Sequence, residues 1–149
     1  MSEQQAPSVT LRQSRNYQFD IAFAPGVAHV LSDEGPPLGA GLGPTPVHLL
    51  LAAVGSCMSS SLYFALTKFK IDPGGITTAA RARMGRNEAG RLRVVHLEVE
   101  IHLGARAESL QHLDRVLGQF EEFCTVGASV REGIPTDVAV FDGSGAKLK

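Results

Sequence analysis

The feature that most constrains this chain is a long helix, which the sequence predicts from Pro46 to about Lys70. Thr45 suits the N-cap and Pro46 suits the first helical position, while the Asp-Pro-Gly-Gly run at 72–75 stops the chain from continuing. The run Leu-Leu-Leu-Ala-Ala-Val at 49–54 leaves the first half of this helix without a polar face. Because a helix that is apolar all round is a buried helix, we expect other elements or a second chain to cover it.

Strands are predicted on both sides of this helix. A period of two from Val9 to Phe23 predicts a half-buried strand or a bent pair of strands, followed by a short returning strand at 27–31. The Gly- and Pro-rich stretch at 34–44 predicts a loop. After the helix, residues 76–84 alternate and turn near 87–90. The return strand is expected to face inward with Val95, Leu97, Val99, Ile101 and Leu103.

A second helix is predicted from about Ala107 to Phe123. Its expected inward stripe has apolar residues three and four apart, namely Leu110, Leu113, Leu117, Phe120 and Cys124. A last strand is predicted at 136–141. The order of strands, helix, hairpin, helix and strand indicates an α+β fold. We expect a flexible terminus at 1–8 and a single domain at 9–149, because 149 residues suit one domain.

The charge and the chain start exclude several classes of protein. With a net charge of −1, no global field draws the chain to nucleic acid or to an anionic membrane. The first residues have neither the basic nor the apolar region of a signal peptide, and the richest apolar run, 49–54, is far shorter than a membrane span of about 20 residues. Two cysteines do not make a secreted disulfide framework. We therefore expect a cytoplasmic protein with no membrane or nucleic-acid partner.

The two cysteines are the candidate reactive groups. Cys57 lies eleven residues after Pro46, Cys124 ends the second predicted helix, and no Cys-x-x-Cys motif is present. One interpretation is two inert thiols in the core, since free cysteine is among the most buried residue types. The other is a pair brought together by packed helices, in which one thiolate attacks an O–O bond and the other resolves the sulfenic acid to a disulfide. Because Cys57 lies in mid-helix, far from that helix's N-terminus, a cationic side chain is expected to lower its pKa.

The segments around both cysteines resemble one family of proteins. The segment 43–57, GPTPVHLLLAAVGSC, resembles the central helix of the osmotically induced protein C and organic hydroperoxide resistance family (OsmC/Ohr). Phe-Cys-Thr-Val at 123–126, with Ser129 and the turn to Gly133, resembles the second cysteine motif of that family. Ser-Asp-Glu at 32–34, the loop at 34–44 and the order of elements from about residue 10 to 141 fit the same family.

The resemblance implies an OsmC-like fold in an intertwined homodimer, in which antiparallel sheets wrap around two long central helices and the active sites lie at the subunit interface. It matches Cys57 to the peroxidatic cysteine and Cys124 to the resolving one. It implies thiol-dependent reduction of organic hydroperoxides in oxidative stress defence, without a cofactor or metal. A dithiol, such as a lipoylated protein, would return the enzyme to its reduced state.

The chain departs from the family at the residues that activate the thiol. The acid that precedes the first cysteine is replaced at its two known positions by Val47 and His48, and residues 33–46 contain no arginine. Arg12, Arg15 and Arg131 are candidate substitutes. The departures motivate an alternative function, a dimeric binding protein of the same fold with an apolar interface pocket and little or no peroxidase activity.

Other candidate sites are weaker. His48 lies nine residues before Cys57, about 13 Å along the helix axis, and is expected to be a helix-start residue near solvent. A zinc site lacks a close pair of ligands. The arginines of the hairpin at 81–93 are expected to be solvated and paired with glutamates. The serine run at 59–61 lacks the strand–turn–helix context of a nucleophile elbow.

Overall fold

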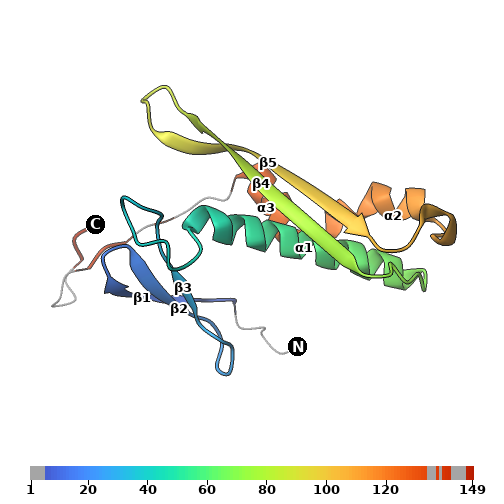
Figure 1. Ribbon diagram of the computed structural model, residues 1–149, viewed down its shortest axis with the longest axis horizontal. Coiled ribbons are helices and arrows are strands. Elements are labelled where there is room, and N and C mark those ends of the chain that lie inside the picture. The colour runs from blue at the N-terminus through green and yellow to red at the C-terminus, as the bar shows by residue number, and fades with distance from the viewer. Residues whose placement is uncertain (1–5, 134–136, 138, 142–146) are drawn as a thin grey trace. The chain divides into compact units, whose positions relative to one another are not determined.

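The computed structural model of this chain describes residues 6–133, 137, 139–141 and 147–149, and Figure 1 shows its elements. The chain divides into two compact units. One contains the residues up to Ser56 together with Thr77–His102, and the other contains Cys57–Ile76 and the described residues from Leu103 onward. The long helix contributes its first half to one unit and its second half to the other. Both cysteines belong to the second unit.

A three-stranded antiparallel sheet of order β1-β2-β3 belongs to the first unit (Figure 1). β1 (Thr10–Arg15) pairs with β2 (Gln18–Ala22), and β2 pairs with β3 (Val30–Ser32). The predicted bent pair of strands is confirmed. β3 begins later than predicted, because the turn at 24–27 is followed by residues without strand pairing before Val30.

The loop after β3 has no helix or strand, as predicted, and is organised around the buried carboxylate of Asp33. This carboxylate accepts hydrogen bonds from the backbone N–H groups of Glu34, Ala40 and Leu42 at 2.8, 3.2 and 3.1 Å. Burial raises the pKa of Asp33, but these N–H groups together with the amide of Gln18 outweigh it, and the pKa lies below its ordinary value. The carboxylate therefore ties the two ends of the loop together and links the loop to Gln18 at the start of β2.

The long helix α1 runs from Pro46 to Lys68. At its N-terminus the hydroxyl of Thr45 accepts the backbone N–H of His48 at 3.4 Å, as expected of an N-cap. At its C-terminus Lys70 has a φ of 56°, and the N–H of Ile71 reaches back to the carbonyl of Leu66 at 3.1 Å. This is the Schellman arrangement with a lysine in the position that glycine usually takes, so the helix ends two residues before the predicted boundary.

One chain does not cover α1 on all sides, so the expectation that other elements or a second chain cover this helix is met only in part within this chain. Val54, Leu62 and Leu66 are buried, whereas Ala52, Ala53 and the aromatic residues Tyr63 and Phe64 are exposed. By length and a mean hydropathy of 1.7, α1 could cross a membrane, and 22% of its most apolar window is buried in the chain. The apolar part of α1 is thus longer than the run at 49–54, which alone was too short to predict a membrane span. Core helices of soluble proteins meet the same criterion, so it is weak support for a membrane span.

The predicted hairpin is confirmed by β4 (Ile76–Arg86) and β5 (Leu92–Leu103), which pair with each other (Figure 1). From Leu97 to Leu103 the apolar residues are half-buried and the alternate residues are exposed. The exception is Val95, which is 52% exposed although it was predicted to face inward. Arg81 pairs with Glu100 at 2.7 Å across the strands, as expected of a solvated hairpin.

The second long helix was a wrong prediction. In its place lie η1 (Ala107–Ser109), α2 (Leu113–Gln119), η2 (Phe120–Phe123) and α3 (Thr125–Glu132). The helical path is broken at His112, which has a φ of 57°, and at Cys124, which has extended backbone. Because the helix restarts at Leu113, the inward stripe shifts, so that Val116 is buried and Leu117 is 47% exposed.

The predicted last strand at 136–141 falls partly outside the described residues, at positions 136 and 138. Within the described tail, Phe141 forms an isolated antiparallel bridge with Lys147.

Candidate active site

The two cysteines lie on different helices of the second unit, and both are free thiols. Cys57 lies in the middle of α1 and is partly exposed, whereas Cys124 is fully buried. Cys124 does not end a second helix as predicted. It is the N-cap of α3, and its sulfur accepts the backbone N–H of Gly127 at 3.3 Å. The residue therefore begins the helix whose first turn surrounds the site.

Cys57 and Cys124 are close enough for each thiol to shift the pKa of the other. Burial raises the pKa of Cys57, but four donors outweigh it and hold the pKa below its ordinary value. These donors are the backbone N–H of Val126, the thiol of Cys124, the backbone N–H of Gly127 and the hydroxyl of Ser61. Hydrogen bonds to an ionised group favour that form, so Cys57 is the thiol of this pair that ionises first.

The pKa of Cys124 moves in the opposite direction. Burial raises it, and so does the neighbouring Cys57, since Cys124 as a neutral thiol donates to the Cys57 thiolate and a second negative charge beside it is unfavourable. When the pair loses its first proton, the thiolate therefore forms on Cys57.

The first turn of α3 supplies the backbone donors of this site. Val126 and Gly127 are the second and third residues of α3, where the N–H groups of a helix have no partner within the helix. We expected a cationic side chain because Cys57 is remote from the N-terminus of its own helix. The donors come instead from the N-terminus of another helix, α3, which begins because the helical path is broken at Cys124.

Close packing at Gly127 fixes this arrangement. A Cβ atom at this position would lie 2.9 Å from the sulfur of Cys124 and 3.0 Å from Cε of Met58. Glycine is thus required for α3 to begin this close to the cysteines.

Ser61 is a residue of the site that the sequence analysis missed. It lies four residues after Cys57 on α1 and is 8% exposed, and its hydroxyl contributes to lowering the pKa of both cysteines. The signal was available, because residues four apart share one face of a helix. The serine run had been considered only as a nucleophile motif.

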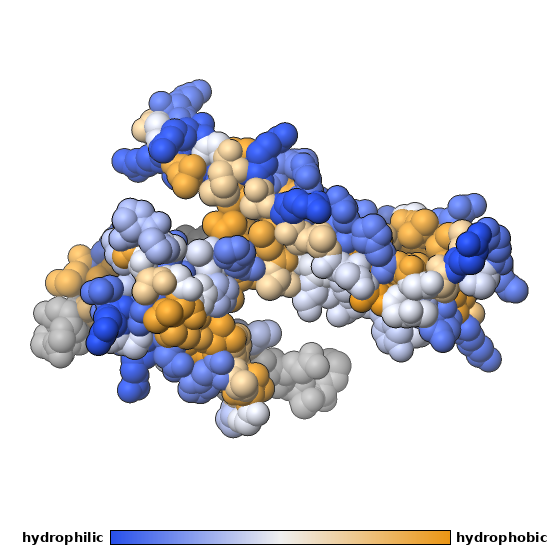
Figure 2. All heavy atoms as spheres, viewed as in Figure 1, coloured by the Kyte–Doolittle hydropathy of each residue, from blue (hydrophilic) through white to orange (hydrophobic). Residues whose placement is uncertain are grey.

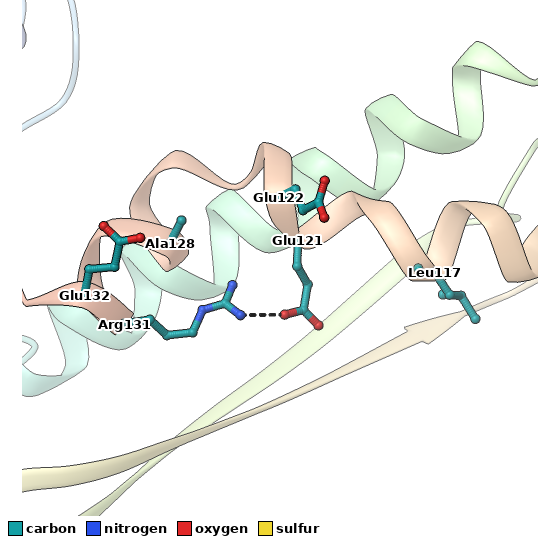
Figure 3. A pocket seen from close by; sticks show the side chains of 7 residues that line it. Leu117, Glu121, Glu122, Ala128, Arg131 and Glu132 are labelled. Atoms are coloured by element: carbon teal, nitrogen blue, oxygen red, sulfur yellow. Dashed lines mark hydrogen bonds and ion pairs between the residues drawn. The ribbon is translucent and has the colours of Figure 1, made fainter.

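Each candidate activating residue from the sequence has a place of its own in the structure. The guanidinium of Arg131 pairs with the carboxylate of Glu121 at 2.9 Å, on the wall of an open surface groove (Figure 3). Arg12 and Arg15 lie on β1 in the first unit. Val47 is in the first turn of α1, and His48 is exposed there, with its Nδ1 accepting the N–H of Thr45 at 3.2 Å. His48 is therefore a helix-start residue, as expected.

No metal site emerges from the residues that the structure describes, among which no three His, Cys, Asp or Glu side chains cluster as ligands would. The chemistry that the arrangement can support is that of a thiolate beside a thiol. Such a pair can attack an electrophile with one sulfur and close a disulfide with the other.

The fold and this site define a class: a mixed α/β protein with antiparallel sheets and a paired-thiol site. The sequence model of the OsmC-like protein family matches residues 39–139, and the chain belongs to this family. The resemblance inferred from the sequence is thus confirmed. No curated protein sequence matches the chain significantly.

Solved structures of the family share the fold. An OsmC-like protein of unknown function from Vibrio cholerae aligns with a TM-score of 0.67 at 21% identity, over 87% of this chain and 94% of that one. An organic hydroperoxide resistance protein from Elizabethkingia anophelis aligns with a TM-score of 0.63 at 23% identity, over 88% and 91% of the two chains. The organic hydroperoxide resistance protein OhrB of Bacillus subtilis aligns with a TM-score of 0.63 at 17% identity, over 85% and 91%. At these identities the likeness extends to the fold alone.

Proposed function

We propose that this protein reduces organic hydroperoxides with Cys57 and Cys124. The Cys57 thiolate attacks the terminal oxygen of a hydroperoxide R–OOH. The O–O bond breaks, the alcohol R–OH leaves with one added proton, and Cys57 becomes a sulfenic acid. Cys124 then attacks that sulfur, which releases water and forms the Cys57–Cys124 disulfide. An external dithiol reduces the disulfide to two thiols and is itself oxidised.

The observation that carries this proposal is the unequal environment of the two thiols, since Cys57 is partly exposed while Cys124 is fully buried beside the start of α3. Burial acts against ionisation at both cysteines, yet hydrogen-bond donors lower the pKa of Cys57 while its neighbour raises that of Cys124. An attacking thiol must be a thiolate, whereas a resolving thiol serves by staying close until the sulfenic acid has formed.

The substrate and the reductant follow from the family. Two of the similar structures bear the name organic hydroperoxide resistance protein, which supports an alkyl hydroperoxide as the oxidant. We propose a dithiol, such as a lipoylated protein, as the reductant. With no cofactor or metal in the scheme, all the electrons come from sulfur.

We also propose a cytoplasmic homodimer. Its support is the face of α1 that one chain leaves uncovered, where Tyr63 and Phe64 are 54% and 53% exposed. Further apolar side chains are exposed on other elements and appear in orange on the face shown in Figure 2. Burial of a side chain of this size stabilises by roughly 1.5–3 kcal/mol, so a second chain would gain much by covering this face. A core helix within a dimer also accounts for the hydropathy of α1 without a membrane.

The test is turnover of cumene hydroperoxide with dihydrolipoamide as the reductant, against hydrogen peroxide as a second oxidant. The unmodified protein should prefer the organic peroxide, since each buried CH₂ group gains about 0.8 kcal/mol. Cys57→Ser should abolish turnover, because the nucleophile is lost. Cys124→Ser should react once and then hold a sulfenic acid that dimedone traps. Equal peroxide loss in the unmodified protein and in Cys57→Ser would refute the proposal.

The second candidate is the binding protein with an apolar interface pocket. It is favoured by one observation: among the described residues, no cationic side chain contributes to lowering the pKa of Cys57. This candidate requires that the unmodified protein neither turn over cumene hydroperoxide nor form a sulfenic acid at Cys57.

A further inference from the structure

The end of the β4–β5 hairpin, residues 83–95, concentrates positive charge. This hairpin tip contains four of the fourteen lysines and arginines of the chain and one of its fifteen acidic residues, so its net charge is +3. The net charge of −1 for the whole chain conceals the tip, because the rest of the chain then carries −4. A local patch of one sign attracts a partner of the opposite sign even where the overall charge is close to zero.

The arginines of the hairpin tip are exposed, and carboxylates do not neutralise them. Two of them donate to backbone carbonyls of the tip itself, Arg86 to that of Gly90 at 2.7 Å and Arg93 to that of Leu92 at 2.8 Å. In the part of the chain that the structure describes, no ion pair with a carboxylate is formed by any of the four, which are Arg83, Arg86, Arg91 and Arg93. Their charges therefore remain available to a partner.

Apolar side chains are exposed among these arginines. They are 42%, 55% and 52% exposed and belong to Met84, Leu92 and Val95. A Cβ atom at Gly85 would lie 2.9 Å from Cγ1 of Val95, so these two residues share one side of the hairpin. Because side chains alternate along a strand, Arg83 and Arg93, each two residues from one of them, lie on that same side. One face of the tip thus presents two arginines beside an exposed valine.

We propose that the hairpin tip is a docking surface for an anionic lipid bilayer. An anionic bilayer joins negative charge to an apolar layer just beneath it, and this face of the tip joins positive charge to an apolar side chain. The guanidinium groups bind the phosphates of the headgroups, for which their fork of donors is suited. Val95 enters the boundary between headgroups and acyl chains, as apolar side chains of peripheral proteins do.

This docking is peripheral and involves no membrane span. It goes beyond the reaction at the cysteines and does not depend on it. Among anionic partners, single-stranded nucleic acid fits less well, because its bases stack on aromatic side chains and residues 83–95 contain none.

The test is co-sedimentation of the full-length protein with vesicles of phosphatidylcholine, alone or mixed with phosphatidylglycerol. The unmodified protein should bind the mixed vesicles, hardly bind the neutral ones, and bind more weakly as salt rises to about 0.15 M, because salt screens exposed charges. Each arginine near an anionic surface strengthens binding roughly fivefold, so Arg83→Gln combined with Arg93→Gln should weaken it by about thirtyfold. The matched control is Arg12→Gln combined with Arg15→Gln, which removes the same charge from exposed positions of β1 and should bind nearly as the unmodified protein does.

Val95→Thr distinguishes a bilayer from a soluble polyanion. It keeps the shape of the side chain beside Gly85 but replaces a methyl group with a hydroxyl, so binding to the mixed vesicles should fall several-fold while binding to heparin stays the same. Equal binding to neutral and mixed vesicles, or equal binding by the two double variants, would overturn the proposal. Binding to heparin without binding to vesicles would overturn it in favour of a soluble acidic partner. Vesicle binding that Val95→Thr leaves unchanged would overturn the insertion of Val95.

Discussion

The contact between α3 and the cysteines makes a strong prediction at Gly127. In Gly127→Ala the new methyl group would lie 2.9 Å from the sulfur of Cys124 and 3.0 Å from Cε of Met58, so one of these groups or α3 must move. Overpacking of this kind costs typically about 1–3 kcal/mol. Alanine recovers roughly 0.8–1 kcal/mol of that cost, because it favours the helix more than glycine does. We therefore expect a net destabilisation of about 0–2 kcal/mol, measured by urea unfolding.

Gly118→Ala is the matched control. Gly118 lies in α2, and a Cβ there would meet nothing within 4 Å, so only the helix preference changes and the protein should gain roughly 0.5–1 kcal/mol. The two variants should thus differ by about 1–3 kcal/mol, with Gly127→Ala the less stable. Because displacement of α3 also weakens N–H donation to sulfur, Gly127→Ala alone should slow alkylation of Cys57 at pH 7. Equal stabilisation by both substitutions, with unchanged alkylation, would refute the packing of α3 against the cysteines.

Two further predictions concern the loop and the assembly. Asp33→Asn should be less stable than the unmodified protein at pH 7, because the carboxylate that orders the loop is lost. The folded pKa of Asp33 lies below the ordinary value of 3.8, so its contribution is present above that value and fades as pH falls through the folded pKa. Urea unfolding at pH 7 and pH 3 should show the difference between the two proteins narrowing, and a constant difference would contradict this. In light scattering at micromolar concentration the protein should have the mass of a dimer, and Phe64→Glu, which places a charge on the exposed face of α1, should shift it toward the monomer. A monomeric unmodified protein would exclude the proposed assembly.

The long helix and the hairpin could be predicted because their signals are local. Thr45 and Pro46 mark the start of α1 whatever surrounds it, and the alternation from Leu97 to Leu103 records one half-buried face. The second helix could not be predicted in this way. Its apolar residues recur at helical spacing from Leu110 onward, but the backbone of His112 is left-handed rather than helical. Neither a glycine nor a proline at this position marks the break in the sequence. Periodicity reports which residues are apolar, and it does not report where the hydrogen bonds of a helix stop.

The same limit explains what was missed at the site. Cys57 and Cys124 stand out in a sequence as the two reactive residue types, whereas the donors that differentiate them are a serine and two backbone N–H groups. Backbone groups have no sequence signature, and the N-terminus of α3 exists only because the chain restarts its helix at Thr125. An arginine is visible in a sequence as a residue type, whereas the N-terminus of a helix that the sequence does not predict is not visible there.

The second cysteine motif combines a thiol, that of Cys124, with the start of a helix, α3. Cys124 brings the proposed resolving thiol, and the first turn of α3 follows it directly, where the N–H of Gly127 donates to the Cys124 sulfur. Both parts depend on the same start of the same helix, since Cys124 is also its N-cap. A glycine at 127 follows from this, because any larger residue would press on the sulfur that caps the helix. The pKa of Cys57 therefore depends on how α3 packs beside it. It does not depend on an arginine from the loop before α1, because residues 33–46 contain none.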